Sequence, residues 1–171
     1  MGREGAVLWI MGYAGAGKST FAEKLLALLH KKGRTAVWLD GDLMRKLFNL
    51  TGHSKKQRQL AGLKYLNLAK IISSQGVDVI ISSIGMQQIF EDEGRMNFPK
   101  YYQVLISSNL LDSTIRKNRS FYHNDEMNVM GKDIQPDLLT YDIIVDSKFD
   151  SDLKIYLDWC LNLLEYGKVS S

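Results

Sequence analysis

The sequence predicts an α/β fold in which a five-stranded parallel sheet is flanked by helices. Five short apolar segments are nearly continuous rather than alternating, which is typical of strands buried on both faces of a parallel sheet. Helical patterns lie between these segments, and this alternation favours parallel strands joined by helical crossovers. The predicted strands are Ala6–Met11, Thr35–Leu39, Val77–Ile81, Tyr101–Ile106 and Asp142–Val145.

Three helices are predicted from apolar stripes and from residues that start or stop helices. The first follows a glycine-rich turn and ends before Gly33. One apolar stripe with helical spacing runs along it, made of Phe21, Leu25, Leu28 and Leu29. The other two are Lys55–Ser74, which Ser54 can cap, and Leu153–Leu164, which Asp152 or Ser151 can cap.

Composition indicates one globular domain over residues 1–171. Apolar residues make up 45% of the chain and charged residues 24%, which is ordinary for a globular protein. The net charge of +3 is too small to indicate a nucleic-acid partner, although it suits a protein that binds small anions. Cys160 is the only cysteine, and no apolar run approaches the roughly 20 residues that span a bilayer. We therefore expect a cytoplasmic protein without a membrane partner.

A long polar segment from Ser120 to Thr140 has no clear periodicity. Loops of this length are usually lids, binding loops or disordered segments. Together with the basic residues that precede it, this segment predicts a polar lid over about residues 112–140. A loop without a function is the alternative.

The turn after the first predicted strand reads GYAGAGKST and has the fixed residues of a phosphate-binding loop. Its glycines let backbone N–H groups turn toward phosphate oxygens, and the N-terminus of the following helix adds its dipole. The loop predicts ATP or GTP with Mg²⁺: Lys18 reaches the β- and γ-phosphates, Ser19 binds the metal, and Thr20 lies on the α-phosphate side. The predicted ATP-binding residues of the loop are Gly12, Ala14, Gly15, Ala16, Gly17, Lys18, Ser19 and Thr20.

Two carboxylates, Asp40 and Asp42, follow the second predicted strand, where open α/β sheets bind ligands. One can accept the proton of an incoming hydroxyl or orient it, while the other holds the waters of Mg²⁺ or the acceptor. We assign catalysis to Asp40 together with Lys18, and Asp40 can also contact the metal through water. The alternatives are that Asp42 only caps the helix that follows it and that Asp40 is only structural.

Basic residues gather at two further places. Arg58 lies in the first turn of the second long helix, where a cation opposes the helix dipole, and an anionic substrate would explain that cost. Arg116 and Arg119 precede the polar segment, and a lid that carries them over the γ-phosphate would stabilise charge during transfer. A solvated face is the alternative for all three, and it is favoured for Lys55 and Lys56.

This chain resembles the adenylylsulfate kinases in three segments that occur in the same order: GYAGAGKST, Leu39-Asp40-Gly41-Asp42-x-x-Arg45 and Gly52-His53-Ser54-x-x-x-Arg58. Residues 116–122 and 129–134 are similar to the lid segments of that family. The resemblance implies a P-loop kinase that uses ATP to phosphorylate the ribose 3′-hydroxyl of adenosine 5′-phosphosulfate (APS), commonly as a homodimer. The implied roles are activation of the hydroxyl by Asp40, acceptor binding by Asp42, Arg45 and Arg58, and an ATP-side lid with Arg116 and Arg119.

The departures from that family fall on the acceptor side. His53 stands where the family has a Phe that stacks on the acceptor base, Ala61 stands where Asn is expected, and residues 83–87 replace I-S-P-Y-R. A divergent branch that includes the cytidine diphosphoramidate kinases is similar at residues 83–86 and 94–104. That branch implies CDP-phosphoramidate as the acceptor, in bacterial capsule biosynthesis. The acceptor-binding residues assigned in this way are His53, Ile84, Gly85 and Met86.

Four alternatives stay open. An adenylylsulfate kinase would make 3′-phosphoadenylylsulfate, and a shikimate- or gluconate-type kinase also pairs a P-loop with carboxylates, although the DGDxxR element disfavours it. A regulatory GTPase is disfavoured because the chain has no Asn-Lys-x-Asp element to read guanine. A nucleotide-binding pseudokinase would explain the missing Phe and Asn, but the retained Lys18, Ser19 and Asp40 argue against it.

Overall fold

A computed structural model describes residues 4–108 and 128–167 of the chain. The described residues contain five strands, which form one parallel sheet in the order β2-β3-β1-β4-β5 and confirm the predicted sheet. The strands are β1 (Val7–Met11), β2 (Ala36–Asp40), β3 (Asp78–Ser82), β4 (Tyr101–Ser107) and β5 (Ile143–Asp146). All but β1 end one residue later than the sequence predicts, so Asp40 is the last residue of β2.

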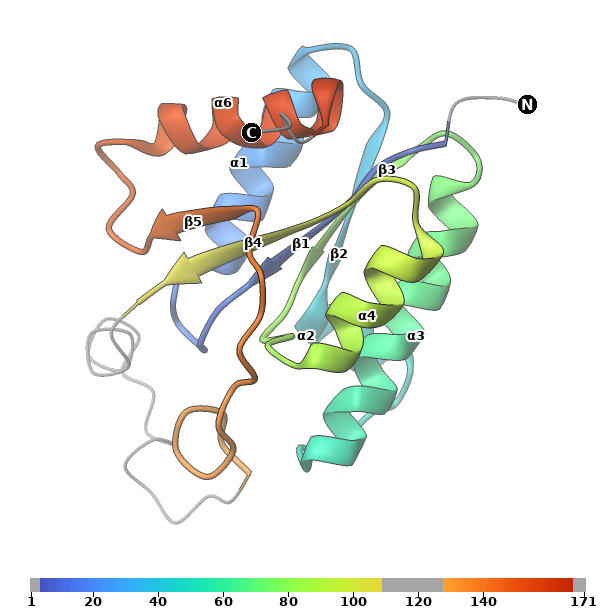
Figure 1. Cartoon of the computed structure of the whole chain (residues 1–171), viewed down its shortest axis with the longest axis vertical. Coiled ribbons are helices and arrows are strands. Elements are labelled where there is room, and N and C mark those ends of the chain that lie inside the picture. The colour runs from blue at the N-terminus through green and yellow to red at the C-terminus, as the bar shows by residue number, and fades with distance from the viewer. Residues whose placement is uncertain (1–3, 109–127, 168–171) are drawn as a thin grey trace.

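Helices cover both faces of this sheet (Figure 1). They are α1 (Lys18–Lys31), α2 (Gly41–Leu47), α3 (Lys55–Ser73), α4 (Gln88–Asn97) and α6 (Leu153–Tyr166). α1 and α6 lie on one face and α3 and α4 on the other, while α2 is a short helix at the end of β2. α1, α3 and α6 confirm the three predicted helices, and α4 is a helix for which the sequence analysis gave no range.

The strands are buried on both faces because their side chains alternate between two cores. In β1, Leu8 and Ile10 pack in the core beneath α1 and α6, whereas Val7, Trp9 and Met11 pack in the core beneath α3 and α4. All five side chains are fully buried. This double burial explains why the strands appear as continuous apolar runs in the sequence.

The strand order places a cleft at the carboxyl ends of β1 and β3. These strands are neighbours, but β1 leads into α1 on one face of the sheet and β3 leads into α4 on the other. Open α/β sheets bind ligands in the crevice where neighbouring connections diverge in this way. The phosphate-binding loop therefore meets the residues that follow β2 and β3 at this edge.

The helix ends follow the predicted signals with one exception. Ser54 caps α3 and forms a capping box with Gln57, and Gly33 ends α1 in a left-handed conformation with a φ of 72°. Asp152 precedes α6, but its side chain makes no capping hydrogen bond. Within the described ranges, no helix is both long and apolar enough to cross a membrane.

Candidate active site

Four parts of the chain build the cleft: the phosphate-binding loop, the residues after β2, the first half of α3 and the loop after β3. Its cavity has a volume of about 370 Å³. A cavity of this volume is within the range of small-molecule sites. Val129 and Met130, from the described end of the predicted lid, also line it. Residues predicted for the donor and residues predicted for the acceptor thus meet in one cleft.

The donor end of the cleft is shaped by backbone. Gly12, Gly15 and Gly17 have φ angles of 148°, 84° and 103°, which residues with a Cβ rarely adopt. A Cβ on Gly12 would also lie 2.7 Å from the backbone oxygen of Ile106. The loop leads into α1, whose first turn holds no acidic residue to oppose a phosphate. The predicted loop residues that line the cleft are Ala14, Gly15, Gly17, Lys18, Ser19 and Thr20, whereas Gly12 and Ala16 are buried.

Lys18 lies across the phosphate-binding loop. Its ammonium group donates a hydrogen bond of 2.8 Å to the backbone oxygen of Tyr13. An ammonium group has three N–H donors. Lys18 can therefore keep this contact with the loop and still donate to phosphate oxygens.

The Asp40 carboxylate joins β2, β3, α1 and α2. Its Oδ1 accepts from the backbone N–H groups of Asp42 (3.0 Å) and Leu43 (3.2 Å), so that Asp40 is the N-cap of α2. Its Oδ2 accepts from the hydroxyls of Ser19 (3.1 Å) and Ser82 (3.2 Å). The alternative that Asp42 caps this helix is wrong, because β2 extends to Asp40 and the helix begins one residue later. These four donors occupy the roughly four lone-pair positions that a carboxylate offers.

The pair of Ser19 and Asp40 fits the requirements of Mg²⁺. The exposed Ser19 hydroxyl donates its proton to Asp40, which leaves its oxygen lone pairs available to a metal. Mg²⁺ prefers hard oxygen ligands and, in kinases, is held by one or two protein groups together with substrate phosphates. Ser19 would hold the ion directly and Asp40 through water, and the bound ion would neutralise charge on the phosphates.

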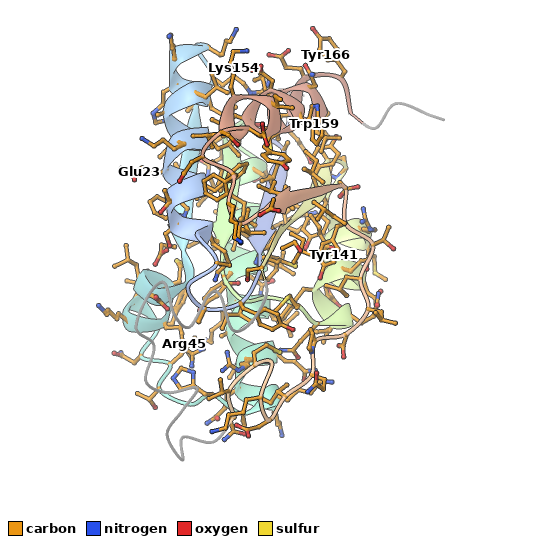
Figure 2. All side chains as sticks on the ribbon, turned by 90° about the vertical axis from the view of Figure 1, so that its left-hand side faces the viewer. Glu23, Arg45, Tyr141, Lys154, Trp159 and Tyr166 are labelled. Atoms are coloured by element: carbon orange, nitrogen blue, oxygen red, sulfur yellow. The ribbon has the colours of Figure 1, made fainter. Side chains whose placement is uncertain are left out.

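Asp42 and Arg45 project from α2, and both line the cleft. The Asp42 side chain is exposed, and among the described residues no hydrogen bond reaches its carboxylate. Arg45 donates to the backbone oxygen of Gly52, and Figure 2 shows it at the end of the molecule opposite Tyr166. Tyr65 of α3 donates to Gly41 (3.2 Å); burial raises the pKa of its hydroxyl, and the nearby Arg45 guanidinium acts in the opposite direction.

Arg58 connects α3 to the described end of the predicted lid. Its Nε donates to the backbone oxygen of His53 and a terminal nitrogen donates to that of Asn128, both at 2.8 Å. A guanidinium presents five N–H donors in a fixed planar arrangement, which suits Arg58 to binding an anion. The exposed His53 lines the same part of the cleft.

Two stacked aromatic rings form an apolar wall of the cleft. Trp9 and Phe90 have ring centroids 4.9 Å apart and an interplanar angle of 27°, and both line the cavity. The Trp9 indole donates to the Ser83 hydroxyl at 2.9 Å. Gly85 has a φ of 50° and packs on Trp9, while Gly62 of α3 lies against Phe90. Both glycines are required here, because an added Cβ would lie 2.8 Å from Trp9 and 2.4 Å from Phe90.

The remaining predicted site residues divide into three groups. Ile84 and Gly85 line the cleft as predicted. Met86 is not among the lining residues, because its side chain is buried in the core beneath α3 and α4. Arg116 and Arg119 lie outside the described residues, as does the lid up to residue 127.

Sequence reasoning missed Trp9, Tyr65, Gln87 and Phe90, all of which line the cleft. Tyr65 follows Arg58 by seven residues, and this helical spacing places both on one face of α3. That signal could have identified Tyr65. Trp9 and Phe90 have no comparable signal, since each looks like an ordinary core residue in the sequence.

Comparison with known proteins relates this chain to a family of kinases. The family model for adenylylsulphate kinase matches residues 4–132, which is more than half of the chain. A cytidine diphosphoramidate kinase from Campylobacter jejuni is 28% identical over 152 residues, which cover 86% of this chain and 89% of that protein. A probable adenylyl-sulfate kinase from Pyrococcus abyssi is 33% identical over 104 residues, which cover 60% of each chain.

The fold has a similar counterpart among solved structures. The Mycobacterium tuberculosis APS kinase CysC, in complex with AMPPNP and APS, matches this chain with a TM-score of 0.83. The match covers 94% of this chain and 99% of that chain at 21% identity. At that identity the likeness supports the fold alone, and it confirms the predicted P-loop kinase architecture.

Proposed function

This chain belongs to the adenylylsulphate kinase family, and within it we propose an enzyme that uses ATP to phosphorylate the ribose 3′-hydroxyl of CDP-phosphoramidate. One observation carries the proposal: the cleft combines a complete donor loop with an acceptor end that departs from the usual family at His53 and at residues 83–87. Similarity to the Campylobacter jejuni cytidine diphosphoramidate kinase, which spans 86% of this chain, supports the acceptor.

At the donor end, the loop binds the triphosphate of ATP. Backbone N–H groups of the loop and the N-terminus of α1 face the phosphates, and Lys18 donates to the β- and γ-phosphates. Ser19 and Asp40 would hold Mg²⁺, and the bound ion would offset the negative charge of the phosphates. Phosphoryl transfer depends mainly on positioning and on charge stabilisation, and these residues supply both.

At the acceptor end, Asp42 accepts the hydroxyl proton. Asp40 was the predicted base, but its carboxylate already accepts four hydrogen bonds, whereas Asp42 is exposed beside it. The 3′-oxygen forms a bond to the γ-phosphorus as the bond to the β–γ bridging oxygen breaks. ADP leaves, and the proton passes to Asp42. Asp40 remains in the catalytic machinery as the group that positions Ser19 and the metal.

Two arginines bind the negative charge of the acceptor. CDP-phosphoramidate carries an anionic phosphate chain, and Arg45 and Arg58 line the cleft on the acceptor side. Each is already anchored to backbone oxygens, so little side-chain freedom is lost when the anion binds. His53 stacks on the acceptor, and Ile84 and Gly85 contact it.

Further parts of the proposal concern the whole chain. Residues 1–171 act as a single kinase domain in the cytoplasm, where ATP is abundant. The lid over about residues 112–140, with Arg116 and Arg119 on the ATP side, stays a prediction, because residues 109–127 lie outside the described part of the chain. The protein forms a homodimer, and its product serves capsule biosynthesis.

The test is ADP release from ATP and Mg²⁺ with a panel of acceptors: CDP-phosphoramidate, APS, CDP, shikimate and gluconate. We expect the highest kcat/KM with CDP-phosphoramidate, and phosphorus NMR of the product should show a new 3′-phosphate monoester. Turnover with shikimate or gluconate alone would contradict the proposal. No turnover with any acceptor would favour a nucleotide-binding pseudokinase.

An adenylylsulfate kinase is the second candidate, supported by the 33% identity to the Pyrococcus abyssi protein. The variant His53→Phe separates the two, because a phenyl ring restores the stacking residue of the usual family and adds area to the stack. We expect the variant to gain APS turnover relative to CDP-phosphoramidate turnover. A wild-type enzyme that already prefers APS would establish this second candidate instead.

A further inference from the structure

Gln87 is a buried polar residue of the cleft that the proposed mechanism does not use. It precedes α4, is 1% exposed and lines the cavity. Its backbone is satisfied, since its N–H donates to Gly85 and its carbonyl accepts from Phe90. Its side chain does not cap α4, and among residues 4–108 and 128–167 its Oε1 atom has no hydrogen-bond partner.

An unpartnered amide oxygen in a protein interior is costly and calls for a partner. The chain offers a comparison in Gln103 of β4, which is fully buried and also has an unpartnered Oε1. Gln103 is not among the residues that line the cleft, and its Nε2 donates to Tyr101 at 3.1 Å. Burial of an amide is therefore not by itself a sign of a ligand. Gln87 differs because it is one of the residues that line the cleft.

The surroundings of Gln87 suit a flat aromatic ligand. The stacked rings of Trp9 and Phe90 are buried and line the same cavity, and Gly62 and Gly85 pack directly against them. Aromatic surfaces of this kind bind planar rings, and a polar group at the edge selects among them. A nucleotide base has this shape and carries hydrogen-bonding groups on its edge.

We propose, on the basis of the nucleotide acceptor proposed above, that Gln87 reads the base of the acceptor. Its Oε1 accepts a hydrogen bond from the exocyclic amino group of cytosine, and its Nε2 donates to the adjacent ring nitrogen. Uracil presents a carbonyl oxygen where cytosine has its amino group, so an amide held in this orientation leaves the Gln87 oxygen unpaired when uracil binds. A site built around such a hydrogen bond rejects a ligand that lacks the donor, because a buried group is then left without a partner.

The experiment compares kcat/KM for CDP-phosphoramidate and for its uridine counterpart in the wild type and in Gln87→Met. Methionine keeps the length and volume of the side chain and removes its hydrogen bonds. We expect the wild type to prefer the cytidine acceptor roughly 10- to 100-fold, and the variant to lose most of that preference through a higher KM for the cytidine acceptor. The KM for ATP should stay unchanged.

The matched control is Gln103→Met, which alters the other buried glutamine and should lower thermal stability while keeping the base preference. Calorimetry with CDP and UDP measures the same selectivity without phosphoryl transfer. If no nucleotide is turned over but CDP binds more tightly than UDP, the proposed kinase function fails and the role of Gln87 stands. Equal affinity of the wild type for CDP and UDP, or an unchanged preference in Gln87→Met, would overturn the role of Gln87.

Discussion

The donor end of the cleft is made of one continuous loop, whereas the acceptor end is made of side chains from several separate elements. Three glycines with positive φ and the start of α1 form the donor end within nine residues of sequence, 12–20. The acceptor end combines α2, α3, the loop after β3 and the segment that begins at Asn128.

This difference follows from what each end binds. A triphosphate has the same shape and charge in every ATP, so a loop of backbone N–H groups suits it whatever the acceptor is. Acceptors differ from one another in base and in charge. Side chains such as His53 and Gln87 can be replaced to fit a different acceptor without any change in the sheet. Changes of acceptor within one fold should therefore accumulate at the second end, which is where this chain departs from the adenylylsulfate kinase pattern.

The largest effect is expected at the two carboxylates where the ends meet. Asp42→Asn should lower kcat roughly 10²- to 10⁴-fold through loss of a general base, with little change in the KM for ATP. Asp40→Asn should instead raise the Mg²⁺ concentration needed for half-maximal rate, while α2 persists because Asn also caps helices. Steady-state kinetics across a Mg²⁺ titration measures both.

The two aspartate variants serve as controls for each other, since they are two residues apart and each replaces one carboxylate by an amide. If Asp40→Asn loses more rate than Asp42→Asn at saturating Mg²⁺, Asp40 is the base, as the sequence alone suggested. Calorimetry with ATP should show that both variants still bind the donor.

The second effect should be confined to the donor end. Lys18→Met removes a positive charge that stabilises the transferring phosphoryl group, and we expect a loss in kcat of about 10²- to 10³-fold. Binding of CDP, measured by calorimetry, should be unchanged because the acceptor end is built separately. Lys31→Met, in the last turn of the same helix and exposed, is the matched control. A Lys18→Met enzyme that keeps more than a tenth of the wild-type kcat would contradict the role of Lys18 in phosphoryl transfer.

The sequence predicts the donor end well because that end is local. Strand, loop and helix follow one another in residues 7–31, and their spacing alone predicts a phosphate site there. The five strands were predicted for a related reason, since each is a short run buried on both faces. Asp40 and Asp42 were also located correctly in the cleft, because the carboxyl ends of parallel strands share one edge of the sheet.

Sequence alone could not assign the acceptor end, because its residues meet only through tertiary packing. Trp9 lies in β1 and Phe90 in α4, far apart in the chain, and nothing in either segment indicates that their rings stack beside a ligand. Asp40 caps α2 because β2 ends one residue later than predicted. Apolar periodicity does not locate the end of a strand to within one residue. Met86 was assigned to the acceptor site from the resemblance at residues 83–86, yet its side chain is buried in the core beneath α3 and α4.

A third prediction tests the aromatic wall of the acceptor end. Gly85 and Gly33 both have positive φ, but an added Cβ meets Trp9 at 2.8 Å in the first case and nothing within 4 Å in the second. Gly33→Ala should therefore cost about 1–2 kcal/mol of unfolding free energy from backbone strain alone. Gly85→Ala should cost about 2–4 kcal/mol, because overpacking adds to that strain.

Kinetics distinguish these glycine variants further. Gly85→Ala should raise the KM for the nucleotide acceptor, since the Trp9 ring must shift, and should leave the KM for ATP unchanged. Urea denaturation gives the stabilities and the acceptor panel gives the KM values. If the two variants lose equal unfolding free energy, the Trp9 ring moves aside at little cost. The aromatic wall then does not shape the acceptor site.

The smallest effect concerns pH and the contacts that hold α4 against the chain at Thr140. Burial acts to raise the pKa of Glu91, but hydrogen bonds from the Thr140 N–H (3.1 Å) and the Arg95 guanidinium (2.9 Å) outweigh it and lower the pKa below its ordinary value. A carboxylate whose pKa is lower in the folded state stabilises the fold above its unfolded pKa, and this stabilisation is lost as the pH falls through the folded pKa.

The free energy of unfolding should therefore decrease as the pH falls below about 4.5, the ordinary pKa of this group. Glu91→Gln should flatten that part of the curve, whereas Glu23→Gln on the exposed face of α1 should retain it (Figure 2). If the free energy of unfolding of both variants falls with pH as steeply as that of the wild type, the Glu91 contacts do not stabilise the acceptor side of the cleft. The loss of stability at acid pH then arises elsewhere in the chain.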